Sequence, residues 1–417
     1  MTDVASPAAT APALPVPGEL RPLLGRLPLA LIALGGLGVA LGILVPGLQR
    51  QFAFSWLLAF MFYLSITLGA LFLVLLRHLF DAQWSVPVRR INEHLACSAP
   101  VMAAFFLPIL FNAWVAGPEK ALFGWIHSDP AVDHALYAKK ALLNRPVFTV
   151  GSLAGLANWW LLTNQPRALS LEQDRTGAAA CTFAMRRWSA GGIFLFAPTL
   201  TLGAILWMKS LQWQWFSTMY GVWYFAGSVW ITVATLYVIM TVLHRHGPLA
   251  PVVKDTTYHD AGKLFFAFTV FHAYITFSQY FLIWNASIPE ETFWYAQREE
   301  GSWWGIGMLL IFGHFFLPFL LLLRIDTKKS LTVMLPLAGW AWAMHFADLS
   351  FNIMPVIHDQ GFVLHPLDLA CLMFMGGVLA LWFLRNFRAH APFPQKDPRM
   401  AEALGIHLPP AKPAAQP

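Results

Sequence analysis

The sequence predicts an all-α, polytopic membrane protein with about ten transmembrane helices. Of its 417 residues, 58% are hydrophobic and 12% are charged, and the mean hydropathy is +0.57. An ordinary soluble domain has roughly a quarter of its residues charged, so this composition excludes one. Long apolar runs also recur along the chain, close to the roughly 20 residues that a helix needs to cross about 30 Å of hydrocarbon.

These runs give ten candidate spans in chain order. They cover residues 29–45, 52–76, 95–115, 147–162, 191–208, 222–243, 264–284, 303–323, 331–351 and 367–384. The segments 1–27 and 391–417 are rich in Pro and Ala and are predicted to be disordered, which leaves 28–390 as the transmembrane domain. Because the N-terminal segment lacks the pattern of a signal peptide, we expect the first span to stay in the mature chain.

The distribution of Lys and Arg predicts the orientation. Roughly twenty of the 27 basic residues fall in loops and ends on one face of the predicted membrane domain, and roughly seven fall on the other. Cytoplasmic loops carry the excess of Lys and Arg. Both termini are therefore predicted to be cytoplasmic, and the net charge of +6 is attributed to this bias, with no nucleic-acid partner expected.

A short echo in the sequence suggests an internal repeat. Residues 118–123 (PEKALF) follow the third span, and residues 289–294 (PEETFW) follow the seventh. Membrane proteins often contain such repeats. The echo predicts two four-helix bundles, spans 2–5 and 6–9, in repeat-like halves of about 52–210 and 221–351, with the first and last spans peripheral. Chance similarity between apolar helices is the alternative explanation.

The cysteines exclude several chemistries. Cys97, Cys181 and Cys371 are isolated, so no Cys-x-x-Cys pair is present for zinc or an iron–sulfur cluster and no Cys-x-x-Cys-His for covalent haem. A Gly-rich phosphate loop is also absent from the sequence. We therefore expect no catalytic residue and no metal site in this chain, and we expect any redox centre in partner chains or in a haem held by histidines alone.

Ionisable side chains at membrane depth are the functional candidates, because each costs several kcal/mol unless it faces a cavity or a partner. Residues three or four apart share a helix face, and two such pairs occur here. The predicted proton path comprises His272, Tyr274 and Ser278 in the seventh span, His314 in the eighth, and His345 and Asp348 in the ninth. A histidine hydrogen-bonded within an ordinary core is the alternative for His314.

Two loop clusters could supply the entry to this path. His259, Asp260 and Lys263 lie just before the seventh span. A secondary cluster, Arg77, His78 and Asp81, lies just after the second. Ordinary solvated loop charges remain the alternative for both.

Three blocks in order carry a family resemblance: residues 215–227 (WFSTMYGVWYFAG), 258–264 (YHDAGKL), and 277–280 (FSQY) through 289–292 (PEET). Together they resemble the second large membrane subunit of alternative complex III, a bacterial quinol:cytochrome c oxidoreductase. This subunit belongs to the polysulfide-reductase (NrfD-like) superfamily. The resemblance covers most of the chain from the second span onward.

The resemblance implies a subunit of a respiratory complex in the bacterial cytoplasmic membrane. The implied partners are a homologous NrfD-like membrane subunit, an iron–sulfur subunit and multihaem and monohaem cytochrome c subunits, with an aa3- or caa3-type terminal oxidase as acceptor, and lipids. Haems and iron–sulfur clusters would lie in those partners. Quinone or quinol would bind chiefly to the sister subunit, and this chain would offer a proton path.

Three other functions stay open at this stage. A secondary transporter would also have a repeat and polar groups near the midplane, although Pro100 and Pro108 of the third span have no counterparts in the seventh. A b-type haem could use His272, His314 or His345 as axial ligands. A purely structural membrane anchor is the third.

Overall fold

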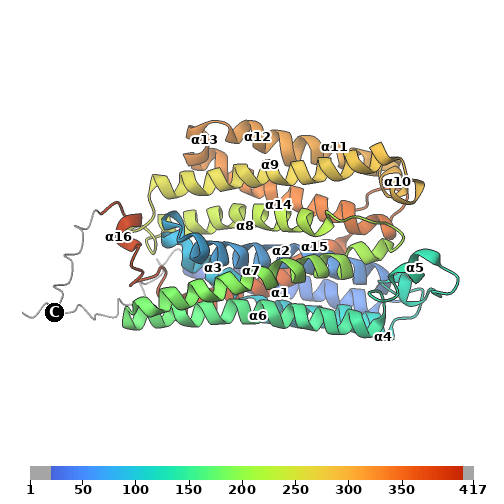
Figure 1. Cartoon of the computed structure of the whole chain (residues 1–417), viewed down its shortest axis with the longest axis horizontal. Helices are drawn as coiled ribbons and strands as arrows, with labels where there is room; N and C mark the ends of the chain where they lie inside the picture. Colours follow the sequence, from blue (N-terminus) through green and yellow to red (C-terminus); the bar gives the residue numbers. More distant parts are fainter. Residues whose placement is uncertain (1–19, 407–417) are drawn as a thin grey trace, which may run out of the picture.

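The computed structural model describes residues 20–406, and this part of the chain forms helices without any β-strand. The long helices run side by side along one axis (Figure 1). They are α1 (Leu20–Leu44), α2 (Gln49–Phe80), α4 (Ala99–Val115), α6 (Arg145–Thr176), α7 (Ala179–Trp207), α8 (Tyr220–Arg245), α9 (Asp255–Ala286), α14 (Leu331–Ile353) and α15 (Pro366–Ala389). A tenth rod is composite: α11 (Gly301–Leu309), the π-helix η4 (Leu310–Phe316) and α12 (Leu317–Leu322).

Short helices connect these rods. The α-helices among them are α3 (Arg89–Ala96), α5 (His134–Lys139), α10 (Pro289–Ala296), α13 (Ile325–Lys329) and α16 (Met400–Ala403). The 3-10 turns are η1 (Gln83–Val88), η2 (Gly124–Ile126), η3 (Lys209–Gln212) and η5 (Met354–Val356).

The ten predicted spans coincide with the ten rods, which confirms the all-α polytopic fold class. Within residues 20–406, eight helices are long and apolar enough to cross a membrane. The other two rods, α6 and α14, are not among these eight, and α14 carries His345 and Asp348. The predicted fourth span ended too early, because α6 continues to Thr176.

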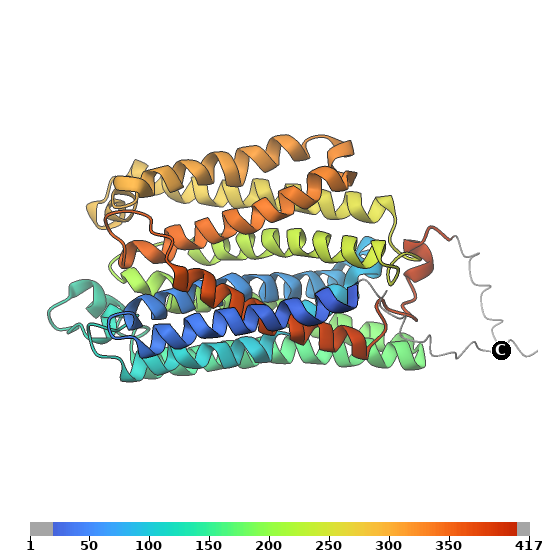
Figure 2. The same ribbon diagram turned by 180° about the vertical axis from the view of Figure 1, so that it is seen from behind.

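Helices α2 and α8 pack against each other at the centre of the molecule. Both are apolar on every side, as expected of helices that others enclose. Each of the two belongs to a group of four: α2 packs with α4, α6 and α7, and α8 packs with α9, the composite rod and α14. Helices α1 and α15 pack together on one side of α2 (Figure 2). This grouping matches the two predicted four-helix bundles with two peripheral helices, while the internal duplication stays a prediction.

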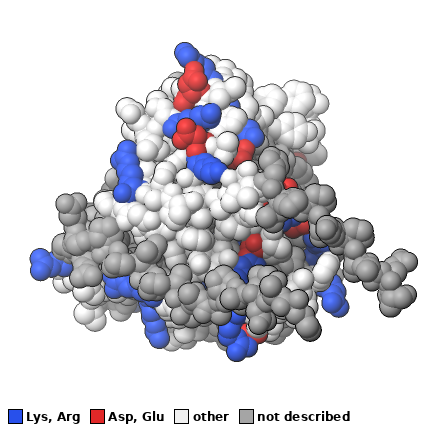
Figure 3. Space-filling view, turned by 90° about the vertical axis from the view of Figure 1, so that its left-hand side faces the viewer, with Lys and Arg blue, Asp and Glu red and all other residues white. Residues whose placement is uncertain are grey.

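Lys and Arg side chains gather at the end of the bundle where α8 ends and α9 begins, which we call the basic end (Figure 3). The first and last described residues also lie at this end (Figure 2). By the excess of basic residues, it is the predicted cytoplasmic side.

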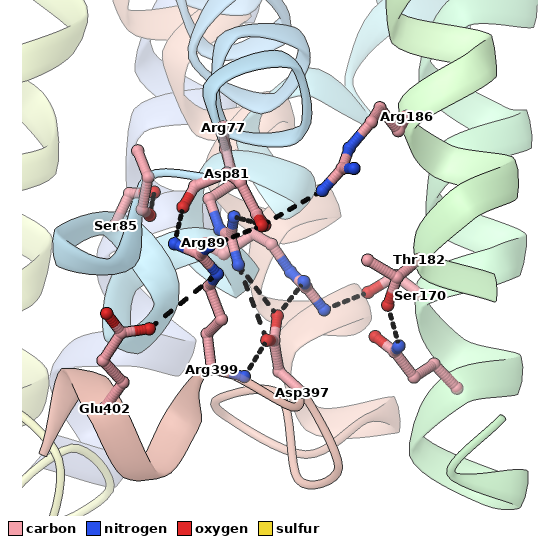
Figure 4. A network of polar contacts seen from close by, with 12 residues as sticks. Arg77, Asp81, Ser85, Arg89, Ser170, Thr182, Arg186, Asp397, Arg399 and Glu402 are labelled. Atoms are coloured by element: carbon pink, nitrogen blue, oxygen red, sulfur yellow. Dashed lines mark hydrogen bonds and ion pairs between the residues drawn. The ribbon is translucent and has the colours of Figure 1, made fainter. Parts of the chain in front are cut away.

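The segments predicted to be disordered lie partly outside the described residues, at 1–19 and 407–417. Elsewhere the prediction is wrong: α1 begins at Leu20, and residues 391–406 pack against the basic end. Asp397 pairs with Arg77 at 3.3 Å and also contacts Arg89, and Arg399 pairs with Asp81 at 2.8 Å (Figure 4). Composition reports a poor capacity to form an apolar core, but it does not report ion pairs.

Candidate functional site

Three helices bring four ionisable side chains together in the second group. His272 comes from α9, His314 from η4, and His345 and Asp348 from α14. All four are at most 4% exposed. His272 Nε2 lies 3.2 Å from Asp348 Oδ2, and the rings of His272 and His314 stack with centroids 4.4 Å apart. The structure thus assembles the histidines and the carboxylate that the sequence predicted.

The π-helix η4 positions His314. A π-helix is rare and is frequently found at functional sites, because its wider turn shifts a side chain out of the α-helical register. Trp230 of α8 stacks on the other face of His314, with ring centroids 3.9 Å apart and planes 21° from parallel. The Trp230 indole N–H donates to Thr269 at 2.8 Å, which fixes the ring. His314 is therefore held between an indole and the imidazole of His272.

Several polar atoms of the site have no hydrogen-bond partner in the described part of the chain: His272 Nε2, His314 Nε2, His345 Nδ1 and Asp348 Oδ2. The contact between His272 and Asp348 is close enough for a hydrogen bond, but its angles do not meet hydrogen-bond geometry. A buried polar atom without a partner costs about 1–3 kcal/mol. Other buried polar atoms of the described chain also lack a partner, but four of them gather in this one cluster.

His345 is anchored by Ser65 of α2. Ser65 Oγ donates to the Phe62 carbonyl at 2.6 Å and lies 2.8 Å from His345 Nε2. Because a hydroxyl has one proton to donate, His345 Nε2 carries the proton of that second bond. The free nitrogen of His345 is then Nδ1, which can accept a proton.

Gly227 of α8 lies between His345 and His272 and has no side chain. A Cβ atom at this position would stand 3.4 Å from His345 Cε1 and 3.5 Å from His272 Nε2. The glycine therefore leaves space between the two imidazoles.

The arrangement suits proton exchange better than coordination. Donor atoms of His272, His314 and Asp348 lie within 4.8 Å of one another. However, the lone pairs of stacked imidazoles lie in two nearly parallel planes and do not converge on one ion, whereas a zinc site needs ligand atoms about 2 Å from a common centre. The same stacking leaves no space for a haem between His272 and His314.

A buried arginine lies beyond the site, toward the end opposite the basic end. Arg298 is 1% exposed and has no carboxylate partner among residues 20–406. It donates to the carbonyls of Phe351 (2.8 Å), Trp294 (2.8 Å) and Asn352 (3.3 Å) and to the Gln212 side chain (3.1 Å). Burial lowers the pKa of Arg298.

Asn352 connects this arginine to the site. Its side-chain amide donates to the Asp348 carbonyl at 2.9 Å, one helical turn away. Sequence reasoning missed Arg298, since a single Arg in a predicted loop resembles a solvated charge. It also missed Ser65 and Trp230, whose mid-span positions were the available signal.

The structure does not bring the remaining α9 candidates into the site. Tyr274 is 62% exposed on the outer face of the bundle, and Ser278 is half-buried one turn further on. Lys263 pairs with Asp260 at 2.6 Å near the basic end, and His259 precedes them.

The link from that entry cluster to the site is not a string of side chains. Between Lys263 and His272 the chain reads LFFAFTVF, in which Thr269 is the one polar residue. The Thr269 hydroxyl already donates to Phe265 and accepts from Trp230.

Arg77, His78 and Asp81 are buried or half-buried. Arg77 and Asp81 belong to the ion-pair network that ties the C-terminal segment to the bundle (Figure 4). Asp81 takes the left-handed conformation (φ 53°) that ends α2, which Asp tolerates better than most residues. Arg77 and Asp81 thus hold the C-terminal segment against α2.

A scan against protein-family models and a search of curated proteins find no match for this chain.

Proposed function

We propose that this chain is an integral membrane subunit that carries protons across the middle of the bilayer within a bacterial quinol-oxidising respiratory complex. The buried cluster of His272, His314, His345 and Asp348 is the observation that carries the proposal. Ionisable groups at membrane depth are retained for function. Imidazole and carboxylate are also the side chains that most readily exchange protons in proteins.

The proton would enter the cluster at His345. Its Nδ1 has no hydrogen-bond partner in the described chain and can accept, while Ser65 holds the ring. The proton then crosses the space that Gly227 leaves, by way of a water molecule, to His272. From His272 Nε2 it passes to Asp348 Oδ2, 3.2 Å away.

His314 would stabilise the charged intermediate. When His272 is protonated, the π-face of the stacked neutral His314 ring stabilises the positive charge. Trp230 holds His314 in place from the other face of that ring. Asn352 and Arg298 stand beyond Asp348 and would orient the release side.

The assignment to a quinol-oxidising complex is supported by the three sequence blocks that resemble alternative complex III. On this proposal the chain packs against a homologous membrane subunit, and the haem and iron–sulfur centres belong to cytochrome c and iron–sulfur partners. Quinol is oxidised chiefly in the sister subunit, and an aa3- or caa3-type oxidase receives the electrons. The membrane is the bacterial cytoplasmic membrane.

The first test is purification in mild detergent through a C-terminal tag, with identification of co-purifying chains and an optical spectrum. Haem and iron–sulfur subunits together with a second ten-helix chain support the proposal. A colourless chain that purifies alone refutes the respiratory assignment and favours a transporter.

The second test is Asp348→Asn in the assembled complex. We expect quinol-driven proton release into or out of vesicles to be lost while the subunits still assemble. Asp359→Asn, at an exposed loop position, is the matched control and should behave as wild type. Unchanged proton translocation by Asp348→Asn would overturn the relay.

A further inference from the structure

A cavity of about 350 Å³ opens between α15 and the central helices α2 and α8, in the half of the molecule toward the basic end. Its wall is almost wholly apolar. The wall includes Val238 and Ile239 of α8, Leu379, Ala380 and Phe383 of α15, and Trp342 of α14. The volume lies within the range of about 300–1,000 Å³ that is usual for ligand sites.

Water is a poor occupant of this cavity. A buried water needs two to four polar partners, and apolar cavities in proteins stay dry. The hydroxyls on the wall are already engaged: Thr67 with Ser98 at 2.7 Å, and Thr235 as acceptor from the Trp342 indole at 3.1 Å. A hydrocarbon chain fits these walls instead.

The end of the cavity nearest the basic end has a different character. Arg388 lines it, is exposed, and has no acidic partner in residues 20–406. His94 also lines it and is 1% exposed. Arg167 donates to His94 Nδ1 at 3.0 Å, so the ring proton is on Nε2, which has no partner in the described chain.

Two aromatic rings complete this end. Phe383 and Phe387 stack with centroids 6.0 Å apart, and the His94 ring lies in a T-shaped arrangement with each of them. An apolar chamber with a cation and an N–H donor at one end matches an amphiphile with a negatively charged head.

We propose that this cavity binds one acyl chain of an anionic phospholipid from the leaflet at the basic end, with the lipid phosphate on Arg388. Basic pockets between transmembrane helices on the cytoplasmic side commonly bind anionic headgroups. The surrounding surface of the basic end, rich in Lys and Arg, favours the same charge (Figure 3).

The inner end of the cavity lies close to the histidine cluster described above. Trp342 at the far end of the cavity precedes His345 by three residues on α14, about one helical turn. The lipid chain would therefore end about one turn from His345, which does not itself line the cavity. The binding site itself stands independently of the proposed proton transfer.

The test is native mass spectrometry of the full chain, delipidated and then supplied with phosphatidylglycerol or phosphatidylcholine. We expect one retained phosphatidylglycerol per chain, with a preference of at least about tenfold over phosphatidylcholine. Ala380→Phe fills the cavity and should abolish retention of the lipid. Arg388→Ala should lose the preference for phosphatidylglycerol and leave the fold intact.

Arg385→Ala is the matched control, since Arg385 is exposed on the same helix and does not line the cavity. It should retain the lipid as wild type does. The proposal is overturned if Arg388→Ala keeps the preference, if no lipid is retained, or if the purified chain carries a quinone in this cavity instead. The Arg388 variant keeps the test decisive should Ala380→Phe fail to fold.

Discussion

Replacing Gly227 by alanine should interrupt the proposed proton link between His345 and His272 without disturbing the packing of the helices. The new Cβ would stand 3.4 Å from His345 and 3.5 Å from His272, which are ordinary van der Waals distances. The methyl group therefore fits. Alanine is also better than glycine in a helix interior by about 0.8–1.0 kcal/mol, so the free energy of unfolding should stay the same or rise slightly.

The same methyl group occupies the space in which a water molecule would link the two imidazoles. General acid–base relays contribute roughly 10²- to 10⁴-fold to a rate, and loss of one link should remove part of that. We expect proton translocation to fall about 10- to 100-fold, which corresponds to about 1.4–2.7 kcal/mol in the barrier.

The assay is quinol-driven proton movement by the purified complex in vesicles that hold a pH-sensitive dye. Gly339→Ala is the matched control, because a Cβ at Gly339 on α14 would meet nothing within 4 Å. Thermal unfolding, followed with a thiol-reactive dye, checks the fold. Wild-type translocation by Gly227→Ala would refute the reasoning, and so would an equal loss in Gly339→Ala.

Three further predictions concern stability. Arg298→Met removes four hydrogen bonds around a buried position and should lower the free energy of unfolding by about 3–5 kcal/mol. Denaturation in mixed micelles measures this, and an unchanged midpoint would contradict this account. Asp397→Asn breaks buried ion pairs and should lower the free energy of unfolding by about 3 kcal/mol or more in the same assay. The control is Glu402→Gln, whose ion pair is solvent-exposed and 3.8 Å long; it should cost at most about 0.5 kcal/mol. Burial lowers the pKa of Lys209 and of Lys139 from 10.5 to about 8. Between these pH values the unfolded chain binds more protons than the folded chain, so the free energy of unfolding should rise from pH 8 to pH 10. Lys209→Gln should flatten that rise in unfolding curves followed by tryptophan fluorescence.

The candidate site shows how far residue patterns lead. His345 and Asp348 could be paired from sequence because a spacing of three places both on one helix face. Tyr274 was grouped with His272, although only residues three or four apart share a helix face. Tyr274 lies two residues from His272, and two residues turn an α-helix by more than a right angle, so the side chain points outward.

The roles of the loop charges could not be predicted from sequence. Arg77 and Asp81 resembled solvated residues or a proton entry, yet they hold a C-terminal segment through Arg399 and Asp397 (Figure 4). These partners are more than 300 residues apart in the chain. A pairing at that separation depends on the folded arrangement of helices.

The sequence by itself determined that this protein is a bundle of about ten membrane helices, because the length and apolarity of each span are local properties and lipid admits only helices or closed barrels. It also determined which buried helix carries which ionisable group. Only the tertiary structure decided that ligand atoms of His272, His314 and Asp348 lie within 4.8 Å of one another and that Gly227 leaves a space between two imidazoles. It also decided that Arg298 is buried with no carboxylate partner among residues 20–406. Those facts depend on how helices distant in the sequence rotate and cross, which packing sets and local sequence does not encode.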